Sequence, residues 1–229
     1  MAAFWTQVKG LANNYFGYNN LGVASDRPYG GTGSSYADPS LASFMGTLTY
    51  TLLDRYTLNL TTRADGSSMV GKDHTWGIFP SISATWDMKK ESFLRNNKSI
   101  RLLNLRTGYG RSGNLGGISS YLTLRQYIPV GLISYNGTPT VTMGTLRNSN
   151  PDLRWETRST FNIGTDLGLF NNRLLLTAEY YYSKTTDMLY EYDVPVPTFA
   201  FDKLLANIGS MSNSGFELGI GVVPISKKD

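Results

Sequence analysis

The chain has 229 residues, a formal net charge of +4 and no cysteine, and only 17% of its residues are charged. The positive charge is modest and scattered, which excludes the basic stripe that nucleic-acid binding requires. The lack of cysteine excludes a disulfide framework and a thiolate metal site. Tyr, Thr, Gly and Asn dominate where Leu, Ala, Glu and Lys would build helices, so the composition predicts an all-β protein.

Strict alternation of apolar and polar residues is the main secondary-structure signal. In residues 56–64 the even positions carry apolar side chains such as Leu58 and Leu60, and the odd positions carry polar ones such as Asn59. Side chains on a strand point alternately to opposite faces, so this period of two predicts extended chain. In chain order the pattern predicts seven strands, near residues 44–52, 55–65, 76–87, 100–112, 155–169, 173–187 and 207–223.

The connections between these strands are alternately short and long. Short or moderate ones are predicted at 53–54, 88–99 and 170–172, and long ones at 66–75, 113–154 and 188–206. Transmembrane barrels join strands of about ten residues by short turns on one side and longer loops on the other. The alternation therefore favours an antiparallel meander that forms part of a transmembrane β-barrel.

The N-terminal part differs from the rest in composition. Residues 1–43 are rich in Gly, Asn, Tyr and Ser and are predicted to form one more long loop, with a short helix around residues 4–13. The first residues lack the basic and apolar segments of a secretory signal peptide. We therefore expect the sequence to be an internal piece of a longer protein.

Two faces follow from the alternation. The apolar phase, which is predicted to face lipid, collects Leu48, Tyr50, Leu52, Tyr56, Leu58, Leu60, Trp76, Ile78, Ile82, Trp86, Leu103, Leu105, Tyr109, Phe161, Ile163, Leu167, Leu174, Leu176, Tyr180, Tyr182, Phe216, Leu218, Ile220 and Val222. The opposite phase collects the charges Arg63, Asp65, Asp87, Arg106, Glu156, Arg158, Asp166, Arg173, Glu179, Asp187 and Glu217. A charge at the lipid-facing midplane costs about 2–4 kcal/mol, so a bilayer would impose this segregation.

A soluble sandwich with polar outer faces is the alternative interpretation of the same pattern. Aromatic residues near the predicted strand ends favour the barrel, because such residues form girdles at the membrane interfaces. These residues are Trp86, Tyr50, Tyr56 and Tyr182.

Several motifs resemble catalytic or nucleotide sites without the context that such sites need. Residues 66–73 nearly match the phosphate-binding P-loop, but Asp73 replaces the required hydroxyl and no helix can follow. Residues 108–113 match G-x-G-x-x-G but lead into another loop instead of a helix. His74 is the sole histidine, and Asp152 and Glu156 are explained as wall ion pairs more simply than as a glycosidase pair. The sequence thus predicts no catalytic, cofactor-binding or metal-binding residue and no enzyme.

A series of ordered segments resembles the SusC/RagA family of TonB-linked outer-membrane transporters. The longest are YTLNLTTRADGSS at 56–68, WGIFPSISATW at 76–86, LRTGYGRSGN at 105–114, NPDLRWET at 150–157 and NIGSMSNSGFE at 207–217. Shorter ones lie at 91–93, 162–166, 172–174 and 180–189. Each segment is weak alone, but their order over residues 43–222 makes the set specific.

The resemblance implies a large plugged barrel in the outer membrane of a Gram-negative bacterium. Such a barrel accepts glycans or peptides from a SusD-like lipoprotein and imports them with energy relayed by TonB. Residues 44–229 would be a partial barrel without the plug domain, through which TonB acts, and without the remaining strands. Alone it would expose two unpaired edges and an apolar, lipid-facing surface.

Substrate recognition is expected in the long loop. Tyr121, Tyr127 and Tyr135 are weak candidates for substrate binding, because tyrosines can stack on sugars and hydrogen-bond to hydroxyl or peptide groups. Packing within the loop or against the lid protein explains them more simply. A surface-exposed adhesin or carbohydrate-binding module is the alternative to nutrient import.

Overall fold

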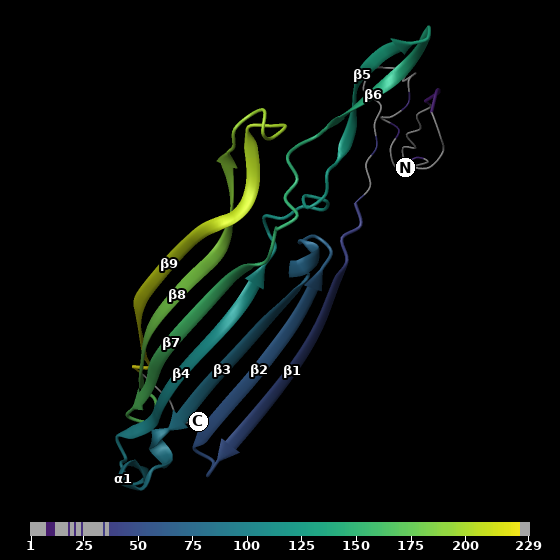
Figure 1. Ribbon diagram of the computed structural model, residues 1–229. Coiled ribbons are helices and arrows are strands. Elements are labelled where there is room, and N and C mark those ends of the chain that lie inside the picture. The colour runs from purple at the N-terminus through teal and green to yellow at the C-terminus, as the bar shows by residue number, and fades with distance from the viewer. Residues whose placement is uncertain are drawn as a thin grey trace, which may run out of the picture.

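The computed structural model describes residues 8–11, 18, 21, 24, 34 and 37–224. Its main feature is a seven-stranded antiparallel sheet in the order β1-β2-β3-β4-β7-β8-β9, with a separate two-stranded hairpin, β5-β6 (Figure 1). The strands are β1 (Leu41–Leu52), β2 (Tyr56–Ser67), β3 (Trp76–Asp87), β4 (Ile100–Asn114), β5 (Tyr127–Tyr135), β6 (Thr138–Thr145), β7 (Glu156–Leu169), β8 (Leu174–Asp193) and β9 (Lys203–Val222). The helical turns are η2 (Lys72–His74), η3 (Met88–Lys90) and α1 (Ser92–Arg95).

The short connections all lie at one end of the sheet, at the bottom of Figure 1. Residues 53–54 and 170–172 turn through positive φ angles, which gives the tight reversal that a twisted hairpin requires. The third connection holds η3 and α1, and its last turn is fixed by Lys89 Nζ, which donates to the carbonyls of Leu94, Arg95 and Asn97. The predicted alternation of short and long connections is present in the structure.

The long connections gather at the opposite end in an assembly that we call the crown, made of residues 68–75, 115–155 and 188–207. Its buried centre is formed by Val70, Ile118, Leu122 and Leu153, and Leu153 is completely buried. Met69, Leu115, Trp155, Leu189 and Leu205 pack around this centre. The largest apolar cluster of the described residues therefore lies above the sheet and does not sit between two layers.

Side-chain amides within the crown join residues 148–154 to residues 201–207, where β9 begins. Asn148 Nδ2 donates to the carbonyls of Phe201 and Lys203, at 2.7 and 2.8 Å, and Asn150 Nδ2 donates to that of Leu205 at 2.9 Å. Asn207 Nδ2 returns a bond to the carbonyl of Arg154 at 2.8 Å. Amide side chains thus donate hydrogen bonds to backbone carbonyls along the upper part of β9.

The structure corrects the predicted extent of several elements. The segment 113–154, predicted as a loop, contains the hairpin β5-β6. A register shift between Pro129 and Gly131 interrupts the alternation of β5, so a period of two does not predict this strand. β8 and β9 continue past a second irregularity near Met188 to twenty residues each, so much of the loop predicted at 188–206 is strand. β1 begins at Leu41, before the predicted start.

The helix predicted around residues 4–13 falls largely outside the described residues. Residues 8–11, which the structure describes, are not helical. No helix in the described part of the chain is both long and apolar enough to span a membrane.

Candidate functional site

One face of the seven-stranded sheet is apolar in a continuous register. A single row of paired residues crosses six strands, through Leu48, Leu60, Ile82, Tyr109, Phe161 and Tyr182. The same register places all the other apolar residues predicted for this face on it, including those of β9. Ile78 and Ile220 are each 65% exposed, so nothing in the described chain covers this face.

Aromatic residues border the apolar face at both ends. Phe44 stacks on Trp76 and Tyr56 stacks on Trp86, each with ring centroids 6.0 Å apart. Trp76 and Trp86 are ten residues apart on β3, which is about 33 Å along a strand. A strand tilt of about 40° reduces this to a height of about 25 Å, the height of the apolar band of outer-membrane barrels. Tyr182, predicted for a girdle, lies mid-strand because β8 continues to Asp193.

Glu91 fixes the lower aromatic pair. Its carboxylate accepts hydrogen bonds from Tyr56 Oη at 2.6 Å and Trp86 Nε1 at 3.0 Å, and forms an ion pair with Arg55 at 2.7 Å. The hydrogen bonds from Tyr56 and Trp86, followed by the charge of Arg55, lower the pKa of Glu91 below its usual value. The two girdle rings are therefore held by a carboxylate from the neighbouring short connection.

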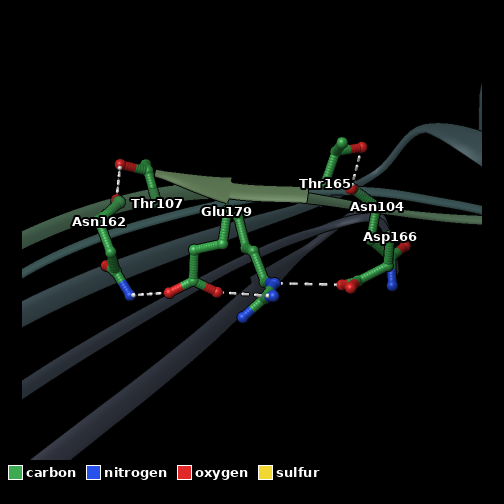
Figure 2. A network of polar contacts seen from close by, with 7 residues as sticks. Asn104, Thr107, Asn162, Thr165, Asp166 and Glu179 are labelled. Carbon is green, nitrogen blue, oxygen red and sulfur yellow. Dashed lines mark hydrogen bonds and ion pairs between the residues drawn. The ribbon is translucent and has the colours of Figure 1, made fainter. Parts of the chain in front are cut away.

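The opposite face carries a network of charged and amide side chains, shown in Figure 2. Arg106 on β4 forms ion pairs with Asp166 on β7, at 3.1 Å, and with Glu179 on β8, at 2.8 Å. Asn162 Nδ2 donates to the other oxygen of Glu179 at 3.4 Å (Figure 2). Glu217 on β9 lies directly opposite Glu179. The network around Arg106 that links β4, β7 and β8 is thus polar, as the predicted phase requires.

A groove of about 500 Å³ lies on the polar face, at the crown end of β1, β2 and β3. Its lining includes Leu41, Met45, Arg63, Asp65, Phe79, Ser81, Arg111, Ser112 and Trp155. Phe79 and Trp155 meet edge to face, with ring centroids 5.6 Å apart. Arg63 Nε donates to both carboxylate oxygens of Asp65, at 2.7 and 2.8 Å. The groove therefore combines a fixed guanidinium group with apolar walls.

Comparison with known proteins identifies the sheet. Residues 2–223 match the family model described as TonB dependent receptor-like, beta-barrel. The chain belongs to the TonB-dependent receptor family. It is 35% identical over 220 residues to TonB-dependent receptor P26 of Formosa agariphila, covering 96% of the chain and 22% of that receptor. It is 37% identical over 199 residues to TonB-dependent receptor SusC of Bacteroides thetaiotaomicron, covering 83% of the chain and 19% of SusC.

A solved structure supports the same assignment. The chain superposes on the RagAB peptide importer in its 'open-open' state with a TM-score of 0.73 and 28% identity, covering 87% of the chain and 22% of that structure's chain. The predicted resemblance to SusC and RagA is thus confirmed. The chain spans about a fifth of the length of the curated relatives that it matches.

Membership of a family of outer-membrane receptors gives the two faces their environments. The apolar face of the receptor wall lies against the lipid of the Gram-negative outer membrane, and the polar face lines the barrel lumen. The chain belongs to a family of receptors and not to an enzyme family, as the sequence predicts.

The structure does not bring the three candidate tyrosines of the receptor together. Tyr121 lies in the crown, where its hydroxyl accepts a hydrogen bond from the Asp38 amide at 3.3 Å. Tyr127 and Tyr135 are 55% and 66% exposed at the two ends of β5. The register shift between them puts them on opposite faces of the hairpin. One ligand cannot contact both from a single face, so they remain separate candidates.

The two motifs that lack a catalytic context lie in the wall and in the crown of the receptor. Gly108, Gly110 and Gly113 all lie within β4, and the near-match to a P-loop runs from the end of β2 into η2. The sequence did not predict a functional role for Leu41, Met45 and Phe79. Their signal was available, since each is a large apolar side chain in a polar phase.

Proposed function

We propose that the chain forms part of the barrel wall of a transporter that imports glycans or peptides across the outer membrane together with a SusD-like lipoprotein. The observation that carries this proposal is the separation of an apolar face from a face that holds the charges, across seven paired strands. SusC and the RagAB peptide importer are among the matched relatives, which supports nutrient uptake over an adhesin or carbohydrate-binding module.

The remaining parts of such a transporter lie outside this chain. In the proposed assembly, the partial barrel predicted at residues 44–229 begins three residues earlier, at Leu41, and the preceding residues belong to an extracellular loop. A plug domain fills the lumen and contacts TonB, and the lipoprotein covers the crown end of the barrel. The long connections cluster at that end, as recognition loops on a rigid scaffold usually do.

Uptake by cells that carry the full-length receptor tests the proposal. Deletion of the receptor gene should abolish growth on at least one glycan or peptide mixture as the limiting nutrient, and the full-length gene should restore it. Removal of TonB activity should abolish the same growth, and the affinity-tagged receptor should co-purify with a lipoprotein. Unchanged growth of the deletion strain on every glycan and peptide source supplied would refute nutrient import.

A further inference from the structure

The lumenal face of the first three strands departs from its polar pattern at one place. Every lumenal residue of β1 and β2 is Ser, Thr, Asn, Arg or Asp except Leu41 and Met45, and in β3 the exceptional large apolar residue is Phe79. Met45 pairs with Arg63, and Arg63 pairs with Phe79, so these three residues form one row. Leu41 and Met45 are 65% and 70% exposed. Exposed apolar side chains gathered at one place on the otherwise polar lumenal face of these three strands indicate a surface that contacts a ligand or another segment.

Arg63 is held in place by two neighbouring side chains and keeps unused hydrogen-bond donors. Asp65 fixes its Nε, and one Nη2 proton goes to Ser43 Oγ at 3.2 Å. A guanidinium group has five N–H donors, and the other three of Arg63 have no partner among the described residues. The side chain is 53% exposed, whereas that of Asp65 is 13% exposed. A guanidinium oriented in this way is suited to binding a carboxylate through two parallel hydrogen bonds.

The aromatic residues of the groove are not arranged for stacking on sugars. Phe79 is 8% exposed and meets Trp155 edge to face. Glycines make room for its ring, since a Cβ at Gly113 would lie 2.1 Å from the nearest ring atom. A sugar needs an open aromatic face, and here the exposed apolar surface is aliphatic, from Leu41 and Met45. Aliphatic side chains beside a guanidinium fit a peptide better than a glycan.

We propose that this groove binds short peptides, with a peptide carboxylate on Arg63 and an apolar side chain against Leu41 and Met45. The proposal rests on the import function proposed above and specifies its substrate class. It predicts a preference for a free C-terminal carboxylate over an amide, because an amide cannot accept two charge-assisted hydrogen bonds.

Binding to the purified full-length receptor with its lipoprotein tests the groove. The probes are the peptide Ala-Leu-Ala-Leu-Ala with a free C-terminus, the same peptide as its amide, trigalacturonate and maltotriose. Native mass spectrometry gives the affinity for each. Arg63→Gln should weaken binding of the acid peptide about tenfold and remove the preference for acid over amide, and Arg63→Lys should be intermediate. Met45→Ser should weaken both peptides by a similar factor.

Arg158→Gln is the matched control. Arg158 is also a lumenal arginine and donates to Ser183 Oγ at 2.7 Å; it lies on β7 opposite the lining residue Ser112 but is not itself part of the groove lining. The double variant Arg63→Gln/Asp65→Asn avoids an unpaired carboxylate and should behave as Arg63→Gln does. Heat-modifiable mobility in electrophoresis shows that each variant is folded.

The outcomes separate the two proposals. If the wild type binds and imports peptides and Arg63→Gln binds them with the same affinity, the assignment of peptide binding to this groove is overturned. The proposed import function would then still stand. Loss of trigalacturonate binding with unchanged peptide binding would assign Arg63 to an acidic glycan and overturn the peptide assignment. A wild-type receptor that binds none of the probes and imports neither peptides nor glycans would refute both proposals.

Discussion

The membrane-spanning part of the sheet and the crown above it are stabilised in different ways. In the sheet, neighbouring strands pair residue by residue, and the apolar side chains need no protein partner because lipid covers them. In the crown, the buried cluster around Leu153 and the amide bonds of Asn148 and Asn150 join segments about fifty residues apart. A bilayer therefore replaces a protein core in one region, and the other region must build its own.

Truncation of the crown centre is the strongest test of this difference. Leu153→Ala in the full-length receptor should destabilise the crown by about 2–5 kcal/mol, since it opens a cavity at a completely buried site. Limited proteolysis in detergent should cleave residues 115–155 faster, while heat-modifiable mobility of the barrel is retained. Leu146→Ala, at a 43% exposed position, is the control. Equal cleavage of both variants would show that the crown does not depend on its own core.

Charge insertion tests the opposite region. Leu58→Arg on the lipid face should cost about 2–4 kcal/mol and reduce the amount of folded receptor in the outer membrane. Asn59→Arg, one residue away on the lumenal face, should be much milder because water can reach the charge. Quantitative immunoblotting of heat-modifiable receptor measures both. Similar losses would contradict the assignment of the two faces.

Removal of one of the amide hydrogen bonds between residues 148–154 and the start of β9 should have a smaller effect, restricted to the top of β9. Asn150→Ala deletes the bond to the Leu205 carbonyl and should cost about 1 kcal/mol. Hydrogen exchange followed by mass spectrometry should become faster in residues 203–207 and stay unchanged in residues 212–222. Asn96→Ala, in an exposed turn, is the control. An unchanged exchange rate in residues 203–207 would mean that the hydrogen bond of Asn150 adds no local stability.

Glu91 provides a pH-dependent test at the lower girdle. Its pKa is lowered in the folded receptor, so its stabilising contribution is complete above the usual glutamate pKa and is lost as the pH falls through the lowered value. Glu91→Gln should therefore lower the thermal midpoint of the receptor at pH 7, and the difference from wild type should shrink in acid. A difference that is constant from pH 7 to pH 3 would exclude the carboxylate charge as its cause.

Orientation can be tested with almost no change in stability. Single cysteines at Ser119 in the crown and Asn96 in a short connection can be added to a chain segment that has no other cysteine. A membrane-impermeant thiol reagent should label position 119 in intact cells and position 96 only after the outer membrane is breached. The reverse result would place the crown and its groove in the periplasm.

Particular residues show why the sheet could be predicted from sequence. In an extended chain a period of two fixes the face to which each side chain points. The sequence therefore assigns Leu58 and Leu60 to one face and Asn59 to the other. The hairpin β5-β6 could not be predicted in this way. Its bulge near Pro129 and Gly131 breaks the period, and Tyr127 and Tyr135 consequently face opposite sides.

The groove shows a second limit. Met45 and Phe79 are visible in the sequence as exceptions to the lumenal phase, but their meeting beside Arg63 depends on the register of three strands. The hydrogen bonds of Asn148 and Asn150 to β9 could not be predicted, although Asn150 lies in a segment that resembles the family, because a loop asparagine has many possible partners.

The sequence by itself determined the all-β class, the seven strands of the wall, the two faces and the family. These properties depend on local alternation and on segments read in order, and the membrane makes the alternation strict. Tertiary structure alone decided the crown, the length of β8 and β9, the separation of the candidate tyrosines and the groove at Arg63. Each of these depends on contacts between residues far apart in the chain, whose free energies no local pattern records.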